Sequence, residues 1–426
     1  MYARRRAALG LVLLVLAAFA LAVIKLVAPG DPPSYSPVNL DDDPWAYEPD
    51  REGDFEARAA AGHSHVVYVK SPGGILATAR RVERWRDQVE RAADDAGVDP
   101  DLIEGMVLLE SAGRPDARAS DDLGGAVGLT QILAETGTGL LDLHVDVARS
   151  ERLTRRLARA RGTREADRIR AQRARVDERF DPDKALAATG RYLKLAMDEF
   201  GREDLAVASY HMGIGNLQQV LGAYGDDDAS YPQVYFDASP DREPRAYRLL
   251  AGLGDDSKTY YWRVLASAEV MRLYRENRGE LERLTALHEG SDSGELVLHP
   301  PGEARTFGSE EEVDEALKDG ELRPLARGAL RPEAFALLAY IRDGVRNISG
   351  TKAPLKVTRT IRPGDDIHAT GFAFDISRDY ANGAQAEAFQ FMLDRLEALN
   401  LIAWARSRDT IHITASSEGQ SLLGDQ

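Results

Sequence analysis

The chain has 426 residues and a formal net charge of −16 at pH 7, with 43% hydrophobic and 29% charged residues. This length and balance are typical of a globular protein with two or three domains, and they exclude a disordered chain or a fibre. The absence of cysteine excludes disulfides, thiolate metal sites and a cysteine nucleophile, and the lack of a basic stripe predicts no nucleic-acid partner.

The N-terminus predicts export from the cytoplasm. Arginines at positions 4–6 precede an apolar run over residues 7–27, which only Lys25 interrupts. This run is about long enough to cross a hydrocarbon core of roughly 30 Å, and the arginines should stay in the cytoplasm. Residues 1–29 therefore predict a single-pass anchor in the cell membrane. A cleaved signal peptide is the alternative, because residues 18–20 resemble a small-x-small cleavage site.

The next segments are more polar. Residues 30–60 are rich in Asp, Glu and Pro, which predicts a flexible stalk. Residues 63–69 alternate like a short strand, and the charge pattern over 76–97 predicts a surface helix.

A hydrophobic helix is predicted to begin after Asp99, which can cap its first turn, with Pro100 at the first position. Gly113 should end it. At helical spacing, the stripe that faces the core should carry Ile103, then either Met106 or Val107, and then Glu110.

Glu110 is the most informative residue on this stripe. Burial raises the pKa of a carboxyl, and a glutamic acid with a pKa of about 6–7 suits general acid catalysis near neutral pH. The alternative is a glutamate at the edge of the stripe that reaches out to water.

Helical patterns dominate to about residue 280. An Arg-rich segment with interspersed Asp and Glu predicts a charged helical hairpin inserted over 135–180, with a solvated surface. Residues 222–245 predict a long acidic loop, and 281–325 an interdomain linker. The strands expected at 355–358 and 410–414, with a helix over 384–399, predict a separate α+β domain over 326–426.

Four blocks in the helical part resemble the lytic transglycosylases with a goose-lysozyme-like fold. The resemblance spans roughly residues 92–275, apart from the charged insertion. It implies a mainly α lysozyme-like domain over 61–280. Together with the segments above, this predicts a multidomain protein in which that domain follows an N-terminal transmembrane helix and precedes the smaller α+β domain. The blocks are Glu110-Ser111, Gly128-Leu129-Thr130-Gln131-Ile132, Ser209-Tyr210-His211-Met212-Gly213 and Thr259-Tyr260-Tyr261-Trp262-Arg263-Val264-Leu265.

The resemblance implies cleavage of the bond from N-acetylmuramic acid to N-acetylglucosamine in peptidoglycan, with a 1,6-anhydro product and no cofactor. Glu110 would act first as acid and then as base. Ordinary glycosidases need a second carboxylate, and none stands in these blocks, although Asp121 and Asp122 are near in sequence. A hydrolytic muramidase of the same fold and a non-catalytic wall-binding scaffold are the alternatives.

The same resemblance implies roles for the other residues of the blocks. Substrate binding would fall to Ser111, Gln131, Tyr210, His211 and Tyr260. The sequence departs from the family pattern in having Thr130 for Met, and His211 and Thr259 for Asn. His211 brings a charge that depends on pH.

The C-terminal segment from Ile367 to Ile376 resembles the H-x-x-G-x-A-x-D core of the zinc D,D-carboxypeptidase and D-Ala-D-Ala dipeptidase family. The resemblance implies that His368, Asp375 and the later His412 bind zinc, which leaves an open position for water. It also implies that Arg359 binds substrate and that Asp409, in place of the family's Glu, is the general base. The expected partners are therefore glycan strands, stem peptides and the membrane.

Overall fold

The computed structural model describes residue 43 and residues 45–301, 330–360 and 367–423. The anchor or signal predicted over 1–29 lies outside these residues, as does the linker beyond residue 301. No helix in the described ranges is long and apolar enough to cross a membrane.

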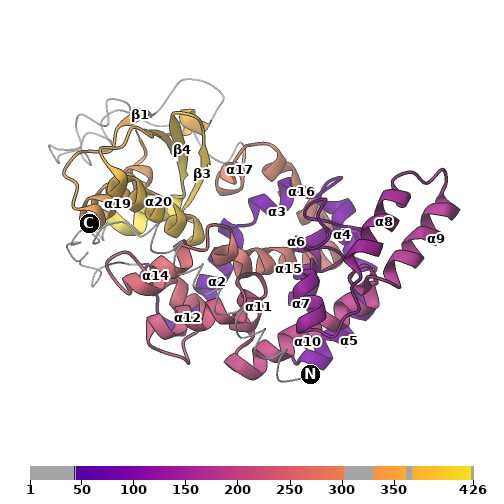
Figure 1. The fold of residues 1–426 in the computed structure, drawn as a ribbon. Coiled ribbons are helices and arrows are strands. Elements are labelled where there is room, and N and C mark those ends of the chain that lie inside the picture. Colours follow the sequence, from indigo (N-terminus) through magenta and orange to yellow (C-terminus); the bar gives the residue numbers. More distant parts are fainter. Residues whose placement is uncertain (1–42, 44, 302–329, 361–366, 424–426) are drawn as a thin grey trace.

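Helices make up the first part of the fold, up to residue 298 (Figure 1). Their bounds are α2 Glu52–Gly62, α3 His65–Val69, α4 Ile75–Glu83, α5 Arg86–Ala96, α6 Pro100–Ser111, α7 Ala134–Gly139, α8 Val147–Leu157, α9 Thr163–Ala174, α10 Pro182–Phe200, α11 Glu203–Met212, α12 Ile214–Tyr224, α13 Tyr231–Asp237, α14 Pro244–Ala251, α15 Tyr260–Glu276, α16 Arg278–Glu289 and α17 Glu295–Leu298.

Helix α6 forms as the sequence predicts. The side chain of Asp99 accepts a hydrogen bond from the backbone N–H of Asp101 at 2.8 Å, and Ala112 and Gly113 turn left-handed at its end. α6 packs closely on α15, because Gly105 has no side chain to separate them: a Cβ there would lie 2.6 Å from the Val264 carbonyl. This pair of helices forms the centre of the helical part.

Three predictions near the N-terminus are wrong. Residues 63–69 hold the short helix α3 instead of a strand, because a five-residue apolar segment fits either form. The single surface helix expected over 76–97 is two helices that break at Trp85, whose indole N–H donates to the Gly113 carbonyl. The stalk expected over 30–60 is folded from residue 45 on, since Phe55 of α2 is buried against Phe236.

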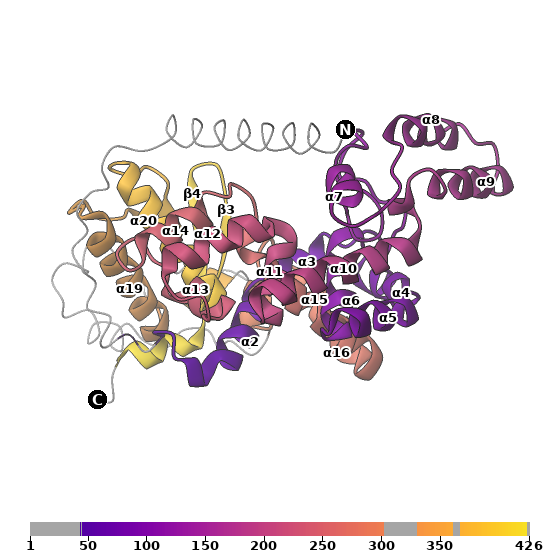
Figure 2. The ribbon, with the colours of Figure 1, turned by 60° about the horizontal axis from the view of Figure 1, so that its bottom comes forward.

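The charged segment forms the helical hairpin that the sequence predicts. α8 and α9 project from the rest of the molecule at the end opposite the sheet (Figures 1 and 2). They share a small core of their own, made of Leu153, Ile169 and Val176. The acidic loop expected over 222–245 instead contains α13 and the start of α14, because Ser230 caps α13 through the backbone N–H of Gln233.

The C-terminal part is a four-stranded antiparallel sheet of order β1-β2-β4-β3, covered by two helices. In the central pair, Asp375 of β2 lies directly opposite His412 of β4. The helix and both strands expected from the sequence are therefore confirmed. The bounds are α19 Pro332–Ser349, β1 Val357–Arg359, β2 Ala373–Ser377, α20 Gly383–Ala398, β3 Ile402–Arg406 and β4 Thr410–Ala415.

The sheet domain packs against the helical part, and one continuous apolar core runs through both. α20 contacts α2, where a Cβ on Gly62 would overlap the Glu397 carbonyl. Lys258, just before α15, pairs with Asp394 of α20 at 2.5 Å. The described start of the predicted linker is helical, since it holds the rest of α16 and all of α17.

Candidate active site

Glu110 lies in the last turn of α6 and is partly exposed to solvent. The stripe below it is fully buried, with Ile103, Met106 and Val107 all at 0% exposure. The hydroxyl of Tyr260, the first residue of α15, donates a 2.8 Å hydrogen bond to Glu110 Oε1. The packing of α6 on α15 thus fixes one carboxyl oxygen from the neighbouring helix.

This environment shifts the acidity of Glu110. Removal from water raises the pKa of its carboxyl to about 7, and the nearby charge of Asp256 adds to the rise. The hydrogen bond from Tyr260 and the positive charge of Arg263 act in the opposite direction. Near neutral pH a large share of the molecules therefore carries the proton, as a general acid requires.

Aromatic rings line up beside the carboxyl. The ring of Tyr260 stacks on His211 at a centroid distance of 5.0 Å and on Tyr210 at 6.4 Å. The Tyr210 hydroxyl donates to the Thr130 carbonyl at 2.8 Å. Blocks one, three and four therefore meet around Glu110, and block two is joined to them through Tyr210.

The second block is a tight loop that needs its glycine. Gly128 has φ +85°, and a Cβ there would lie 1.9 Å from the Arg179 carbonyl oxygen. Gln131 is partly buried with φ +53°, and its amide nitrogen donates to the Gly128 carbonyl at 2.8 Å. The loop is thus closed by its own glutamine.

Arg179 holds this loop from outside and was missed in the sequence. Its guanidinium is fully buried and donates to the carbonyls of Leu123, Gly125 and Ile132 at 2.7–3.1 Å. It is also paired with buried Asp177 at 2.9 Å. Its position within an Arg-rich stretch gave no signal, because only folding separates it from its exposed neighbours.

Ser111 and His211, the two other residues predicted to bind substrate, have different surroundings. Ser111 is buried, and its hydroxyl donates to the Val107 carbonyl one turn back, so it does not meet the Glu110 carboxyl. His211 is exposed, with Nδ1 2.7 Å from the Ser257 hydroxyl. A carboxylate oxygen of Asp255 and one of Asp256 each lie 4.0 Å from a ring nitrogen of His211, so these three exposed residues form an acidic cluster beside the site.

Neither acidic residue that follows block one reaches Glu110. Asp121 is exposed and pairs with Arg118 at 3.3 Å, and Asp122 accepts a hydrogen bond from the Gly124 N–H. In the part of the chain that the structure describes, neither makes a hydrogen bond or ion pair with Glu110. Neither of them therefore provides a second carboxylate at Glu110, and Asp256, whose charge raises the pKa of Glu110, is paired with Arg263.

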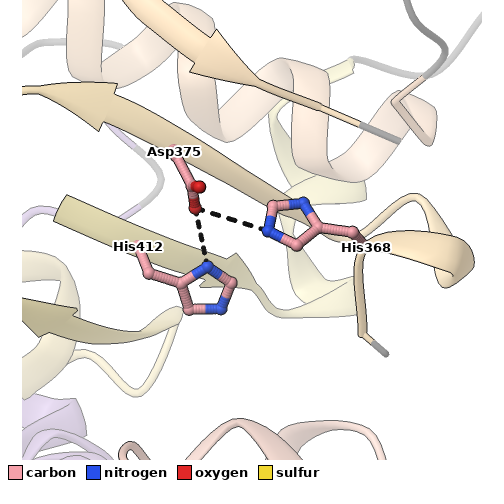
Figure 3. A group of neighbouring side chains, drawn as sticks. All are labelled: His368, Asp375 and His412. Carbon is pink, nitrogen blue, oxygen red and sulfur yellow. Dashed lines mark hydrogen bonds and ion pairs between the residues drawn. The ribbon is translucent and has the colours of Figure 1, made fainter. Parts of the chain in front are cut away.

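A second cluster lies on the C-terminal sheet, where His368, Asp375 and His412 converge (Figure 3). His368 comes from a short helical turn before β2, and the other two come from paired positions on β2 and β4. Asp375 Oδ1 is 3.4 Å from His368 Nε2 and 2.8 Å from His412 Nδ1. The structure therefore brings together the three residues that the sequence predicts as ligands.

This donor set fits a zinc ion. Two ligands of a tetrahedral zinc are about 3.3 Å apart, close to the separation of His368 from Asp375. His368 Nε2 is buried without a hydrogen bond, while Nδ1 of the same ring lies 3.0 Å from the Thr360 carbonyl. One nitrogen is thus oriented by the backbone, and the other is directed at the place for a cation.

The ionisable groups of this cluster shift one another's pKa. Burial alone would raise the pKa of Asp375, but the adjacent imidazoles of His368 and His412 hold it well below its ordinary value. Burial alone would lower the pKa of His412, but hydrogen bonds to Asp375 and Glu295 raise it to about 9. The carboxylate thus stays ionised, as a metal ligand must.

The remaining two predicted residues differ in their placement. Arg359 of β1 lies beside the cluster, with Nε 3.4 Å from Asp375 Oδ2. Asp409 is exposed in the turn between β3 and β4, and in the described residues it is not part of the cluster. Asp409 precedes the first residue of β4, and its role as the general base stays a prediction. Glu295 of α17, which the sequence did not single out, contacts His412 at 2.8 Å instead.

Comparison with known families identifies one domain. Residues 160–231 match the model of the transglycosylase SLT domain. The matched segment runs from α9 through α12 and includes Tyr210 and His211, while Glu110 and Tyr260 lie outside it. A search of curated proteins finds no significant match. The family match supports an enzyme of the lytic transglycosylase type that acts on peptidoglycan glycan strands.

Proposed function

We propose that the protein is a lytic transglycosylase that cleaves the bond from N-acetylmuramic acid to N-acetylglucosamine and forms a 1,6-anhydro sugar. The observation that supports this most directly is Glu110, partly exposed beside Tyr260 with a pKa of about 7. A carboxyl group in this state can give up a proton and take one back near neutral pH.

The proposed reaction has two proton transfers. Protonated Glu110 gives its proton to the glycosidic oxygen as the bond from that oxygen to the anomeric carbon breaks. The resulting carboxylate then takes the proton of the muramic acid's carbon-6 hydroxyl, whose oxygen bonds to the anomeric carbon. Glu110 regains its proton, and no water is consumed. Tyr260 holds Oε1, so the other carboxyl oxygen is the one that exchanges the proton.

Sugar binding is assigned to the residues around this carboxyl. The amide nitrogen of Gln131 is used within its own loop, so its amide oxygen is the atom that accepts a hydrogen bond from the glycan. The exposed ring of His211 is the wall for the sugar beside Glu110, and the buried ring of Tyr260, on which it stacks, supports it from behind. For Ser111 we propose support of α6 rather than sugar contact.

Replacing the acid tests this proposal. Glu110→Gln keeps the shape of the side chain but cannot donate the proton, so release of glycan fragments from purified peptidoglycan should stop. Asp121→Asn is the matched control, because it removes an exposed carboxyl from the same region and should leave release unchanged. Continued release by a folded Glu110→Gln protein contradicts the assignment. If neither the variants nor the wild type release glycan fragments, that result supports the scaffold alternative.

We also propose that residues 1–29 anchor the enzyme in the cell membrane, with the described residues outside the cytoplasm. The apolar run and the arginines before it support this placement. Peptidoglycan strands would then be within reach of Glu110. Protease digestion of intact spheroplasts should remove the described part of the chain, whereas protection from the protease would contradict this orientation.

For the C-terminal domain we propose a zinc site built from His368, Asp375 and His412, with stem peptides as the substrate class. The convergence of the three side chains, whose ligand atoms all lie within 4.8 Å of one another, supports this most directly. When bound, zinc would supply Lewis-acid chemistry for amide hydrolysis. Arg359 is placed to attract a peptide carboxylate near Asp375. Metal analysis of purified protein tests the proposal: wild type should hold zinc and His368→Ala should lose it.

A further inference from the structure

The sequence places α17 in the linker before the C-terminal domain. In the structure, however, α17 supplies a carboxylate to the cluster of His368, Asp375 and His412. Glu295, its first residue, has Oε2 2.8 Å from His412 Nε2. The same oxygen accepts a 3.1 Å hydrogen bond from the Thr414 hydroxyl. Both contacts reach β4 from a segment more than a hundred positions earlier in the chain.

The imidazole of His412 is held at both of its nitrogens. Nδ1 faces Asp375 at 2.8 Å, and Nε2 faces Glu295 at 2.8 Å on the opposite edge of the ring. When Glu295 accepts the Nε2–H bond, the lone pair of Nδ1 is directed toward Asp375 and His368. A carboxylate in this position fixes the tautomer and the orientation of a metal-binding histidine.

The segment that carries Glu295 is itself fixed to the sheet. Four residues later, the ring of His299 stacks on Phe372 at 3.8 Å, and its Nε2 lies 2.7 Å from the Ala415 carbonyl. α17 also contacts β3, and it follows α16 and α15 in the chain. Figure 1 shows α17 between the sheet and the helical part. Glu295 is therefore held in place both by the sheet, which its own segment contacts, and by the helices α15 and α16 that precede α17.

We propose that Glu295 is a positioning residue for the C-terminal metal site, which it completes from the segment that joins the two domains. This inference rests on the zinc site proposed above. The three ligand atoms lie within 4.8 Å of one another, and Glu295 acts on them through the far nitrogen of His412. A fragment that begins at residue 326 would keep all three ligands but lack this carboxylate.

Zinc affinity measured on the purified full chain by competition with a chelator tests the proposal. Removal of such a partner typically weakens metal binding by about 10–100-fold, so this loss is expected for Glu295→Ala. Glu295→Gln keeps an oxygen that can accept the Nε2–H bond and should recover part of the affinity. Glu289→Ala, which removes an exposed carboxylate at the end of α16, should bind zinc as wild type does.

A second readout does not depend on any variant. In zinc-loaded wild type, nitrogen-15 chemical shifts of His412 should show coordination through Nδ1 and a proton on Nε2. Coordination through Nε2 would overturn the inference, because that atom faces Glu295. Equal affinity of Glu295→Ala and wild type would also overturn it while leaving the zinc site intact. Failure of wild type to bind zinc would overturn the zinc site, and this inference with it.

Discussion

The hydrogen bond from Tyr260 to Glu110 predicts a measurable change in the pH dependence of glycan cleavage. Tyr260→Phe removes a 2.8 Å bond that favours the ionised carboxylate. A hydrogen bond to a charged group contributes about 1.5–3 kcal/mol, against about 1 kcal/mol for a neutral pair. Since one pKa unit corresponds to about 1.4 kcal/mol, the pKa of Glu110 should rise by about one unit from its value of about 7.

The assay is the rate of fragment release from purified peptidoglycan as a function of pH. A general acid must be protonated, so activity falls as pH rises through its pKa, and the alkaline limb should move upward by about one unit in Tyr260→Phe. Tyr210→Phe is the matched control, because that hydroxyl donates to the Thr130 carbonyl. An unmoved limb in Tyr260→Phe, or the same shift in both variants, would refute the reasoning.

Three further outcomes concern stability. Burial raises the pKa of Glu110, so its ionised carboxylate destabilises the fold above about pH 7, and this effect vanishes below about pH 4.5. Thermal melts at about pH 8 should therefore show Glu110→Gln to be more stable than wild type by roughly 2–3 kcal/mol. Near pH 5 the difference should be much smaller. Arg179→Met should cost about 3–5 kcal/mol in urea unfolding, while exposed Arg175→Met should change little. Gly128→Ala should lower the free energy of unfolding far more than Gly225→Ala, whose loss of about 1–2 kcal/mol comes only from the strain of a positive φ. Equal losses of stability in the two variants would contradict the close approach of Gly128 to the Arg179 backbone.

Elements with local signals could be predicted from the sequence. Asp99, Pro100 and the apolar stripe define α6 within a dozen residues, so the position of Glu110 at the end of the buried stripe followed directly. Alternation of apolar residues around His412 gave β4 in the same way. In both cases the information lies within one helix or strand.

Contacts between distant segments could not be predicted in this way. Arg179 is buried because it binds carbonyls of a loop about fifty positions earlier, and nothing in its own neighbourhood distinguishes it from exposed arginines. Glu295 stands in an acidic stretch that reads as a linker, and only the docking of α17 on the sheet brings it to His412. α3 was misread because five residues are too few to separate the helical period from the strand period.

The proposed mechanism consumes no water, and this property gives the most direct test of the proposed chemistry. Wild-type protein is incubated with purified peptidoglycan in water enriched in heavy oxygen, and the released fragments are weighed by mass spectrometry. The proposed mechanism predicts fragments with 1,6-anhydro ends, lighter by one water than hydrolysis products and free of the heavy isotope. Reducing ends that contain heavy oxygen would show that water attacks the anomeric carbon, and would contradict it.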